Sequence, residues 1–206
     1  MLLATPRLCR GDPLDTLAAV LPFVDVVQVR LESEHPGAPA AAADVHAWTL
    51  QVLELVARAP EPPLVLVNDR VDIAWVLAQE GVAGVHLGRD DFPVEEARRV
   101  LGEDALIGLS TRSPAQVAAA QVQPVDYLGF GPIYPTTTKG YHAGLGPEAA
   151  WVVSQASDKP VFPIGGIRPE NASELAPVGR AAVSSAILGA EDPVLAARAI
   201  RGALVE

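Results

Sequence analysis

The sequence has little of what defines several common protein classes. Its one cysteine, Cys9, cannot form a disulfide within the chain, which favours a reducing, cytoplasmic location. No apolar run approaches the roughly 20 residues that span a membrane, and no signal-peptide pattern opens the chain. Aromatic residues make up only 5% of the chain, so a core must be built from Ala, Val and Leu. We expect a protein without disulfides that does not bind to membranes.

Positive charge is also scarce. The chain has 15 Lys and Arg against 25 Asp and Glu, a formal net charge of -10. Sequence-independent binding of nucleic acid needs a cationic face, so the balance argues against a nucleic-acid partner. If such a chain binds phosphate, it must do so with a local group of cations and backbone N–H groups. The positions of its few cations are therefore informative.

Short apolar runs alternate with longer amphipathic stretches along the whole sequence. The runs predict strands near residues 2–5, 24–30, 64–67, 84–87, 106–109, 127–130, 161–164 and 181–184. The stretches between them predict helices near residues 13–21, 44–58, 71–79, 93–101, 114–121, 147–155, 170–175 and 193–204. Eight repeats predict an α/β fold, a (β/α)₈ TIM barrel forming one domain over residues 1–206. A doubly wound sheet shows the same alternation, but the first strand is not followed by Gly-x-Gly-x-x-Gly.

Polar residues and glycines directly follow most of the predicted strands. They are Gln28, Arg30, Asn68, Asp69, His86, Asp91, Ser110, the 131–140 segment, Gly165, Gly166, Ser184 and Ser185. For His86, the sequence is equally compatible with a role in a site and with a structural hydrogen bond in the core. Each has an ordinary explanation by itself, as a helix cap, a turn or a solvated residue. In a barrel, however, the carboxyl ends of the strands form one rim, where active sites lie. Their joint occurrence predicts a site there.

The residue types point to phosphate chemistry. Gly166, Ser184 and Ser185 follow the last two predicted strands, where barrels commonly bind phosphate. A loop with three threonines, among them Thr136 and Thr138, and one lysine, Lys139, suits an anion clamp. Asp69 and Asp91 together suit Mg²⁺, which takes one or two carboxylates along with phosphate oxygens. Arg30 and Lys139 would face the same anion.

The motifs resemble those of the thiamine-phosphate synthases, also called thiamine-phosphate pyrophosphorylases, over residues 28–193. The resemblance rests on residues 67–74 (VNDRVDIA), 84–91 (GVHLGRDD), 108–111 (GLST), 131–139 (GPIYPTTTK) and 164–167 (IGGI). It implies a (β/α)₈ barrel that joins hydroxymethylpyrimidine diphosphate to hydroxyethylthiazole phosphate. The products are thiamine phosphate and diphosphate, and the implied partners are these small phosphorylated substrates. The resemblance leaves self-association of the chain open.

The resemblance also implies roles for individual residues. The pyrimidine diphosphate would be held by Gln28, Arg30, Asn68, Ser110 and Lys139, of which Arg30, Ser110 and Lys139 would be catalytic. Asp69 and Asp91 would bind Mg²⁺. The thiazole phosphate would be held by Thr136, Thr138, Gly166, Ser184 and Ser185. The implied mechanism is dissociative: diphosphate leaves, and the thiazole nitrogen captures a pyrimidine methyl cation.

Position 32 departs from the family pattern. The family's Gln-x-Arg-x-Lys reads Gln28-Val29-Arg30-Leu31-Glu32 here, so a carboxylate replaces an ammonium. We hypothesise that Arg89 or Arg112 supplies the missing charge. The change favours two alternatives: a thiazole tautomerase, or a non-catalytic binder of thiazole phosphate. Against the tautomerase, Pro132 stands where that relative carries a catalytic histidine.

Overall fold

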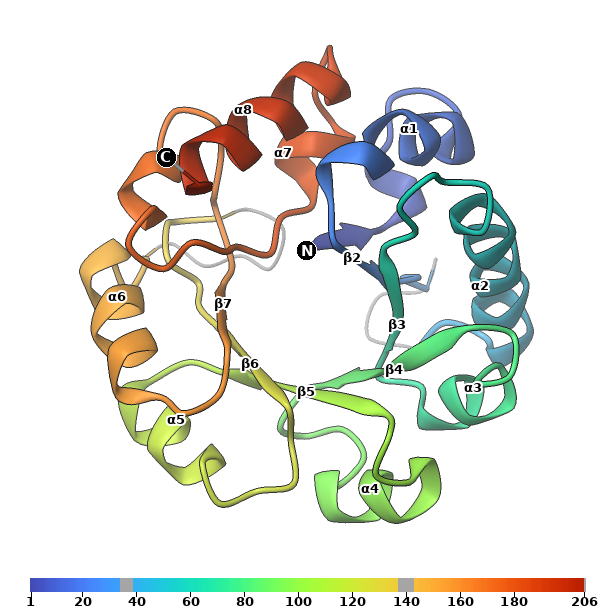
Figure 1. The fold of residues 1–206 in the computed structure, drawn as a ribbon, viewed down its shortest axis with the longest axis horizontal. Coiled ribbons are helices and arrows are strands. Elements are labelled where there is room, and N and C mark those ends of the chain that lie inside the picture. The colour runs from blue at the N-terminus through green and yellow to red at the C-terminus, as the bar shows by residue number, and fades with distance from the viewer. Residues whose placement is uncertain (34–38, 137–142, 206) are drawn as a thin grey trace.

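The computed structural model describes residues 1–33, 39–136 and 143–205, which form a ring of strands inside a ring of helices (Figure 1). Within these residues the strands build one seven-stranded sheet, in which every pairing is parallel and neighbours follow chain order. The strands are β1 (Leu2–Ala4), β2 (Val26–Val29), β3 (Leu64–Asn68), β4 (Val82–Leu87), β5 (Leu106–Thr111), β6 (Tyr127–Phe130) and β7 (Val161–Pro163). The order has no reversal, so the doubly wound alternative is wrong.

The helices lie outside the sheet. They are α1 (Pro13–Val20), α2 (Ala42–Val56), α3 (Val71–Val76), α4 (Val94–Leu101), α5 (Pro114–Ala120), α6 (Pro147–Ala156), α7 (Ser185–Leu188) and α8 (Pro193–Val205), with 3₁₀ turns η1 (Pro6–Leu8), η2 (Leu21–Phe23) and η3 (Ala172–Leu175). Several begin with proline, whose missing N–H costs nothing in the first turn. The helix predicted at residues 170–175 is only the short turn η3, and α7 was not predicted. No described helix is long and apolar enough to cross a membrane.

The eighth predicted strand is represented by two single bridges. Ala182 pairs with Ile164 beside β7, and Val183 pairs with Leu2 of β1, both in parallel. Leu3 N–H donates to the Val183 carbonyl at 2.9 Å, which ties this segment to the first strand. The described structure thus has an α/β fold with seven parallel strands in a curled sheet, and residues 182–183 lie between its two edges.

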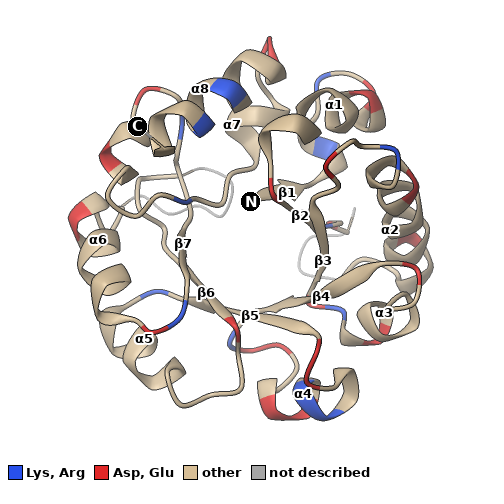
Figure 2. Cartoon of the chain, viewed as in Figure 1, with Lys and Arg blue, Asp and Glu red and all other residues tan. Residues whose placement is uncertain are grey.

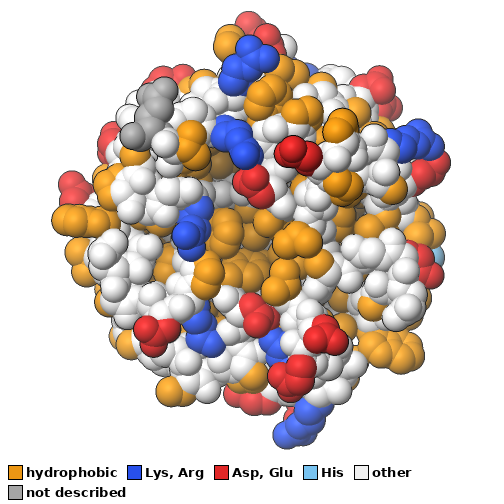
Figure 3. Space-filling view, viewed as in Figure 1, with side chains coloured by type: hydrophobic (Ala, Val, Ile, Leu, Met, Phe, Trp, Pro, Cys, Tyr) orange, Lys and Arg blue, Asp and Glu red, His pale blue; other side chains and the backbone are white. Residues whose placement is uncertain are grey.

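Alternation along the strands separates the core from the interior of the ring. In β2, Val27 and Val29 are fully buried with the hydrophobic core, whereas Gln28 and the following Arg30 line a cavity inside the ring. Successive strand residues point to opposite faces, so a spacing of two keeps these polar side chains together. Most charged residues lie on the outer helices and loops (Figure 2), and the face seen in Figure 3 has hydrophobic side chains at its centre.

Candidate active site

A cavity of about 470 Å³ lies inside the ring of strands. Its size is within the range of sites for small molecules. Residues singled out from the sequence contribute to its lining: Gln28, Arg30, Asn68, Ser110, Thr136, Gly166, Ser184 and Ser185. They come from strands on all sides of the ring, so the fold brings together side chains that are far apart in the sequence.

Of the other predicted site residues, two are not part of this lining and two cannot be placed. Asp69 and Asp91 follow β3 and β4 but are not among the residues that line the cavity. Thr138 and Lys139 lie outside the described residues. The cavity also contains residues that the sequence did not point to, among them Tyr127, Phe162 and Arg168.

His86 sits at the centre of a hydrogen-bonded network in the cavity wall. Its Nδ1 lies 2.9 Å from the Tyr127 hydroxyl, and its Nε2 lies 2.9 Å from Ser110 Oγ. Burial raises the pKa of Tyr127 above its ordinary value, so the phenol stays protonated. The sequence left His86 between a site role and a structural role. In the structure the ring is buried, lines the cavity and links Ser110 to Tyr127, a position that is compatible with both roles.

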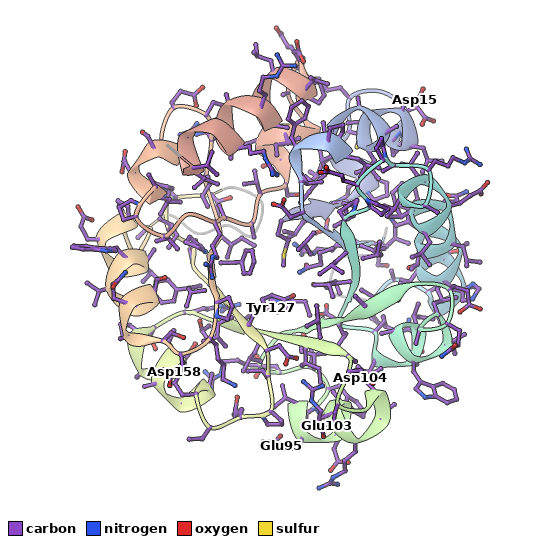
Figure 4. The ribbon with its side chains drawn as sticks, in the orientation of Figure 1. Asp15, Glu95, Glu103, Asp104, Tyr127 and Asp158 are labelled. Carbon is purple, nitrogen blue, oxygen red and sulfur yellow. The ribbon has the colours of Figure 1, made fainter. Side chains whose placement is uncertain are left out.

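Two strand glycines make room for this network. A Cβ at Gly108 would overlap the Tyr127 ring, and a Cβ at Gly129 would lie 3.2 Å from the His86 ring. Glycine within a strand commonly marks such a close approach. Tyr127 also packs edge-on against Phe162, with ring centroids 5.5 Å apart. Figure 4 shows Tyr127 on the inner side of the strands, while the labelled acidic residues lie on the outer helices and loops.

Another part of the cavity wall is formed by a glycine turn after β7. Gly165 and Gly166 have φ angles of 99° and 66°, in the left-handed region that favours glycine. The Asn171 side chain fixes the turn, because its Nδ2 donates to the Gly166 carbonyl at 3.0 Å and its Oδ1 accepts from Arg168 N–H at 2.8 Å. A Cβ at Gly166 would crowd Tyr134 and Pro135. The position therefore needs glycine for both space and conformation.

Ser184 and Ser185 complete this wall. Ser184 directly follows the bridging segment, and its hydroxyl donates to the Leu3 carbonyl at 3.0 Å. Ser185 is the first residue of α7. Both line the cavity together with Gly166. Small residues with hydroxyl and backbone N–H donors thus gather where phosphate binding was predicted.

The two predicted metal ligands lie at the carboxyl ends of neighbouring strands. Asp69, with a φ of 63°, donates its N–H to the His86 carbonyl of β4 at 2.8 Å. Its Oδ2 accepts a hydrogen bond from the Asn68 side chain at 2.6 Å. Asp91 Oδ2 accepts from Gly88 N–H at 2.7 Å, just after β4. Each carboxylate is therefore oriented by a donor at the end of a strand.

This donor set fits Mg²⁺. The part of the chain that the structure describes holds no cluster of three or more His, Cys, Asp or Glu side chains suited to a metal. Mg²⁺ does not require one, because it commonly binds through one or two carboxylates, substrate phosphates and water. Two carboxylates at adjacent strand ends meet that requirement.

Two arginines pair with Glu32, the residue that stands at position 32 after β2. The Glu32 carboxylate forms an ion pair with Arg30 at 3.0 Å and a second ion pair with Arg7 of η1. Burial lowers the pKa of the Arg30 guanidinium, and the negative charge of Asp69 acts in the opposite direction. Of the two arginines hypothesised to replace the missing charge, Arg112 lines the cavity. Arg89 is exposed and is not part of the lining.

Comparison with known proteins identifies the family. The model of the TMP-TENI family, described as thiamine monophosphate synthase, matches residues 1–187. A thiamine-phosphate synthase from Mycobacterium sp. (strain KMS) is 42% identical over 206 residues, covering 95% of this chain and 88% of that protein. One from Haloquadratum walsbyi is 46% identical, covering 68% of this chain and 63% of that protein. A bifunctional thiamine biosynthesis protein from Symbiobacterium thermophilum is also 46% identical, but the chain spans only 32% of its length.

Solved structures agree in fold. Thiamine phosphate pyrophosphorylase from Pyrococcus furiosus superposes with a TM-score of 0.81 at 27% identity, covering 98% of this chain and 94% of that one. A 3-hexulose-6-phosphate synthase from Salmonella typhimurium superposes with a TM-score of 0.72 at 18% identity, covering 99% and 98%, a likeness of fold alone. On its sequence and its fold, the chain belongs to the thiamine monophosphate synthase family.

Proposed function

We propose that the chain is an enzyme that condenses hydroxymethylpyrimidine diphosphate with hydroxyethylthiazole phosphate to give thiamine phosphate and diphosphate. The observation that carries the proposal is the single cavity that Arg30, Ser110, Gly166 and Ser184 line together. Arg30 and Ser110 belong to its β2 and β5 side, whereas Gly166 and Ser184 follow β7 and the bridging segment at residues 182–183. Two substrates with phosphates at opposite ends match that division.

The pyrimidine diphosphate binds on the side of β2, β3 and β5. Gln28, Asn68 and Ser110 supply hydrogen bonds, and Arg30 supplies positive charge. Lys139 adds a second cation from the loop after β6. His86 and Tyr127 orient Ser110, since the buried imidazole bonds to both hydroxyls.

The thiazole phosphate binds at the glycine turn after β7. Gly166 lets the backbone approach the phosphate closely, because no Cβ intervenes. The hydroxyls of Thr136, Thr138 and Ser185 donate to the phosphate oxygens, and Ser184, whose hydroxyl donates to the Leu3 carbonyl, contributes its backbone N–H. This assignment accounts for the left-handed glycine turn and for the Asn171 side chain that holds it in place.

The reaction breaks one bond and forms another. The bond between the pyrimidine methylene and the diphosphate oxygen breaks, and its electron pair leaves with diphosphate. The thiazole nitrogen donates its lone pair to the methylene carbon, and that nitrogen carries no proton to remove. Arg30 and Lys139 stabilise the charge that develops on the leaving group, and such electrostatic stabilisation is often the largest catalytic contribution.

Asp69 and Asp91, at the carboxyl ends of β3 and β4, would hold Mg²⁺. The ion would supply positive charge to the departing diphosphate, which adds to that of the arginine and lysine side chains. The carboxylates themselves are not part of the cavity lining.

We further propose that the curled sheet is a complete (β/α)₈ barrel in one domain, with residues 182–183 standing for the eighth strand. The bridges from Ala182 to Ile164 and from Val183 to Leu2 support this, because they join the first and last strands. The single cysteine and the small phosphorylated substrates support a cytoplasmic enzyme. Self-association is a separate question for the purified protein.

The test is a reaction of the purified protein with both substrates and Mg²⁺, with thiamine phosphate and diphosphate measured by chromatography. We expect equal amounts of both products, and none when either substrate is omitted. Conversion between thiazole isomers without the pyrimidine would instead support the tautomerase. Tight thiazole phosphate binding without diphosphate release would support the non-catalytic binder.

A further inference from the structure

Glu32 lies between two arginines from different segments of the chain. Its Oε1 is 3.0 Å from Arg30, which follows β2, and its Oε2 pairs with Arg7 of η1, which follows β1. The Arg30 and Glu32 side chains are 17% and 18% exposed, whereas Arg7 is 60% exposed. The three residues, here named the Arg7–Glu32–Arg30 bridge, thus run from the protein surface to the cavity wall.

The charges of this bridge determine the net charge that an anion in the cavity faces. Arg30 lines the cavity, and a carboxylate paired with it alone would cancel its charge. Arg7 adds a second positive charge on the far oxygen of Glu32, which restores a net charge of about +1 to the cluster. Glu32 Oε2 is buried and accepts no hydrogen bond from the described residues, so the adjacent Arg7 charge is what offsets the cost of burying this oxygen.

We propose that Arg7 is a positioning residue for the diphosphate substrate and acts through Glu32. By taking up one oxygen of the carboxylate, Arg7 fixes Glu32 beside Arg30 and keeps the Arg30 guanidinium attractive to anions. The bridge takes the place of the lysine that the family pattern carries at position 32. This inference rests on the proposed function, because it assigns the diphosphate to the Arg30 side of the cavity.

The test measures binding of inorganic diphosphate with Mg²⁺ by titration calorimetry, which requires no turnover. We expect Arg7→Gln to weaken binding roughly five- to tenfold, because Glu32 then neutralises Arg30. In a Glu32→Gln background the same change should weaken it less than about twofold, because an arginine without its carboxylate partner is screened by salt. Arg7→Lys should keep most of the affinity.

Arg10→Gln is the matched control. Arg10 comes shortly after η1 and forms an exposed ion pair with Glu191 at 3.5 Å, away from the bridge. We expect this change to alter diphosphate binding less than about twofold. In turnover, Arg7→Gln should raise the KM for the pyrimidine diphosphate and leave the KM for the thiazole phosphate unchanged, a split that general destabilisation would not produce.

The outcomes separate the bridge from the proposed reaction. The bridge is wrong if Arg7→Gln behaves like Arg10→Gln, if its effect is equal in both backgrounds, or if the wild type does not bind diphosphate. Thiamine phosphate formation would leave the reaction standing in those cases. If the Arg7 and Glu32 variants bind diphosphate as expected but no thiamine phosphate forms, the proposed reaction is wrong and the bridge is supported.

Discussion

Arg98 and Arg30 lie at opposite edges of the same sheet and are used in different ways. Arg98, on α4, donates to the carbonyls of Gly102, Ala105 and Pro124 and to the Asp126 carboxylate, in the loops that lead into β5 and β6. Lys159, before β7, likewise donates to two carbonyls of the loop before β6. At the carboxyl edge, Arg30 lines the cavity instead.

This difference separates cations that stabilise the fold from cations that can bind a ligand. A cation whose donors are taken up by backbone carbonyls holds loops together and has little left for a ligand. A cation in the cavity wall has a weaker role in the fold and is available to an anion. In barrels, features at the amino-terminal edge of the strands serve stability, and those at the carboxyl-terminal edge serve chemistry. The predictions below test whether this chain follows the same division.

The largest effect is expected for Arg30→Gln. We expect kcat/KM to fall roughly 10²- to 10³-fold, because the charge that stabilises the leaving diphosphate is lost. The unfolding free energy should change by less than about 1 kcal/mol, since Glu32 keeps its pair with Arg7. Steady-state kinetics and thermal unfolding measure the two quantities.

Arg58→Gln is the control for this prediction. Arg58 forms an exposed ion pair with Glu54 on α2, far from the cavity lining, and its loss should change neither quantity. A loss of stability in Arg30→Gln that matches its loss of activity would contradict the division between the two edges.

Arg98→Ala tests the opposite edge. We expect it to lower the free energy of unfolding by about 3 kcal/mol, because Asp126 loses its cation and keeps only the Ile107 N–H, and several carbonyls lose the arginine donor. Substrate KM values should be unchanged at temperatures where the variant is folded. Chemical denaturation provides the measurement.

Arg99→Ala is the neighbouring control. Arg99 is 72% exposed and pairs only with Glu96 on the same helix among the contacts described, so its loss should cost less than about 0.5 kcal/mol. Equal costs for Arg98→Ala and Arg99→Ala would show that the loop contacts do not hold this edge together.

Much of the fold follows from the apolar runs of the sequence, but the helix after β7 and the eighth strand do not. The seven named strands lie where short Val, Ile and Leu runs predict them. The stretch after β7 contains Pro169 and Pro177, which limit helix growth, so only η3 forms there. The four residues of α7 are too few to show a helical period. Residues 182–183 make only single bridges, and the local sequence pattern does not distinguish such bridges from a full strand.

The candidate site could be predicted where side chains follow strands, because the period of two fixes their face. Tyr127 was missed because it opens the apolar run of a predicted strand, and its sequence neighbours do not show that Gly108 and Gly129 make room for Tyr127 and His86. The pairing of Glu32 with Arg7 could not be predicted, since the two lie in separate loops and no spacing relates them.

Tyr127→Phe examines a part of the site with no charge. The variant keeps the packing against Phe162 but removes the hydroxyl that lies 2.9 Å from His86 Nδ1. We expect kcat/KM to fall about tenfold, the equivalent of one buried hydrogen bond, because His86 then orients Ser110 less well. His86→Gln should lower activity by a smaller factor in the Tyr127→Phe background than in the wild type, because both changes disturb the same network. Independent, fully additive effects would contradict the network.

The smallest effect is expected for Arg112→Gln. This variant compares two arginines at the carboxyl edge of the sheet, one inside the cavity lining and one outside it. Arg112 lines the cavity but is exposed, so solvent screens its charge, and we expect diphosphate binding to weaken roughly threefold. Arg89→Gln removes the same charge from a residue outside the lining and should leave binding unchanged. Calorimetric titration of diphosphate into both variants provides the comparison. If the two variants weaken binding equally, total charge at this edge matters more than position in the cavity wall.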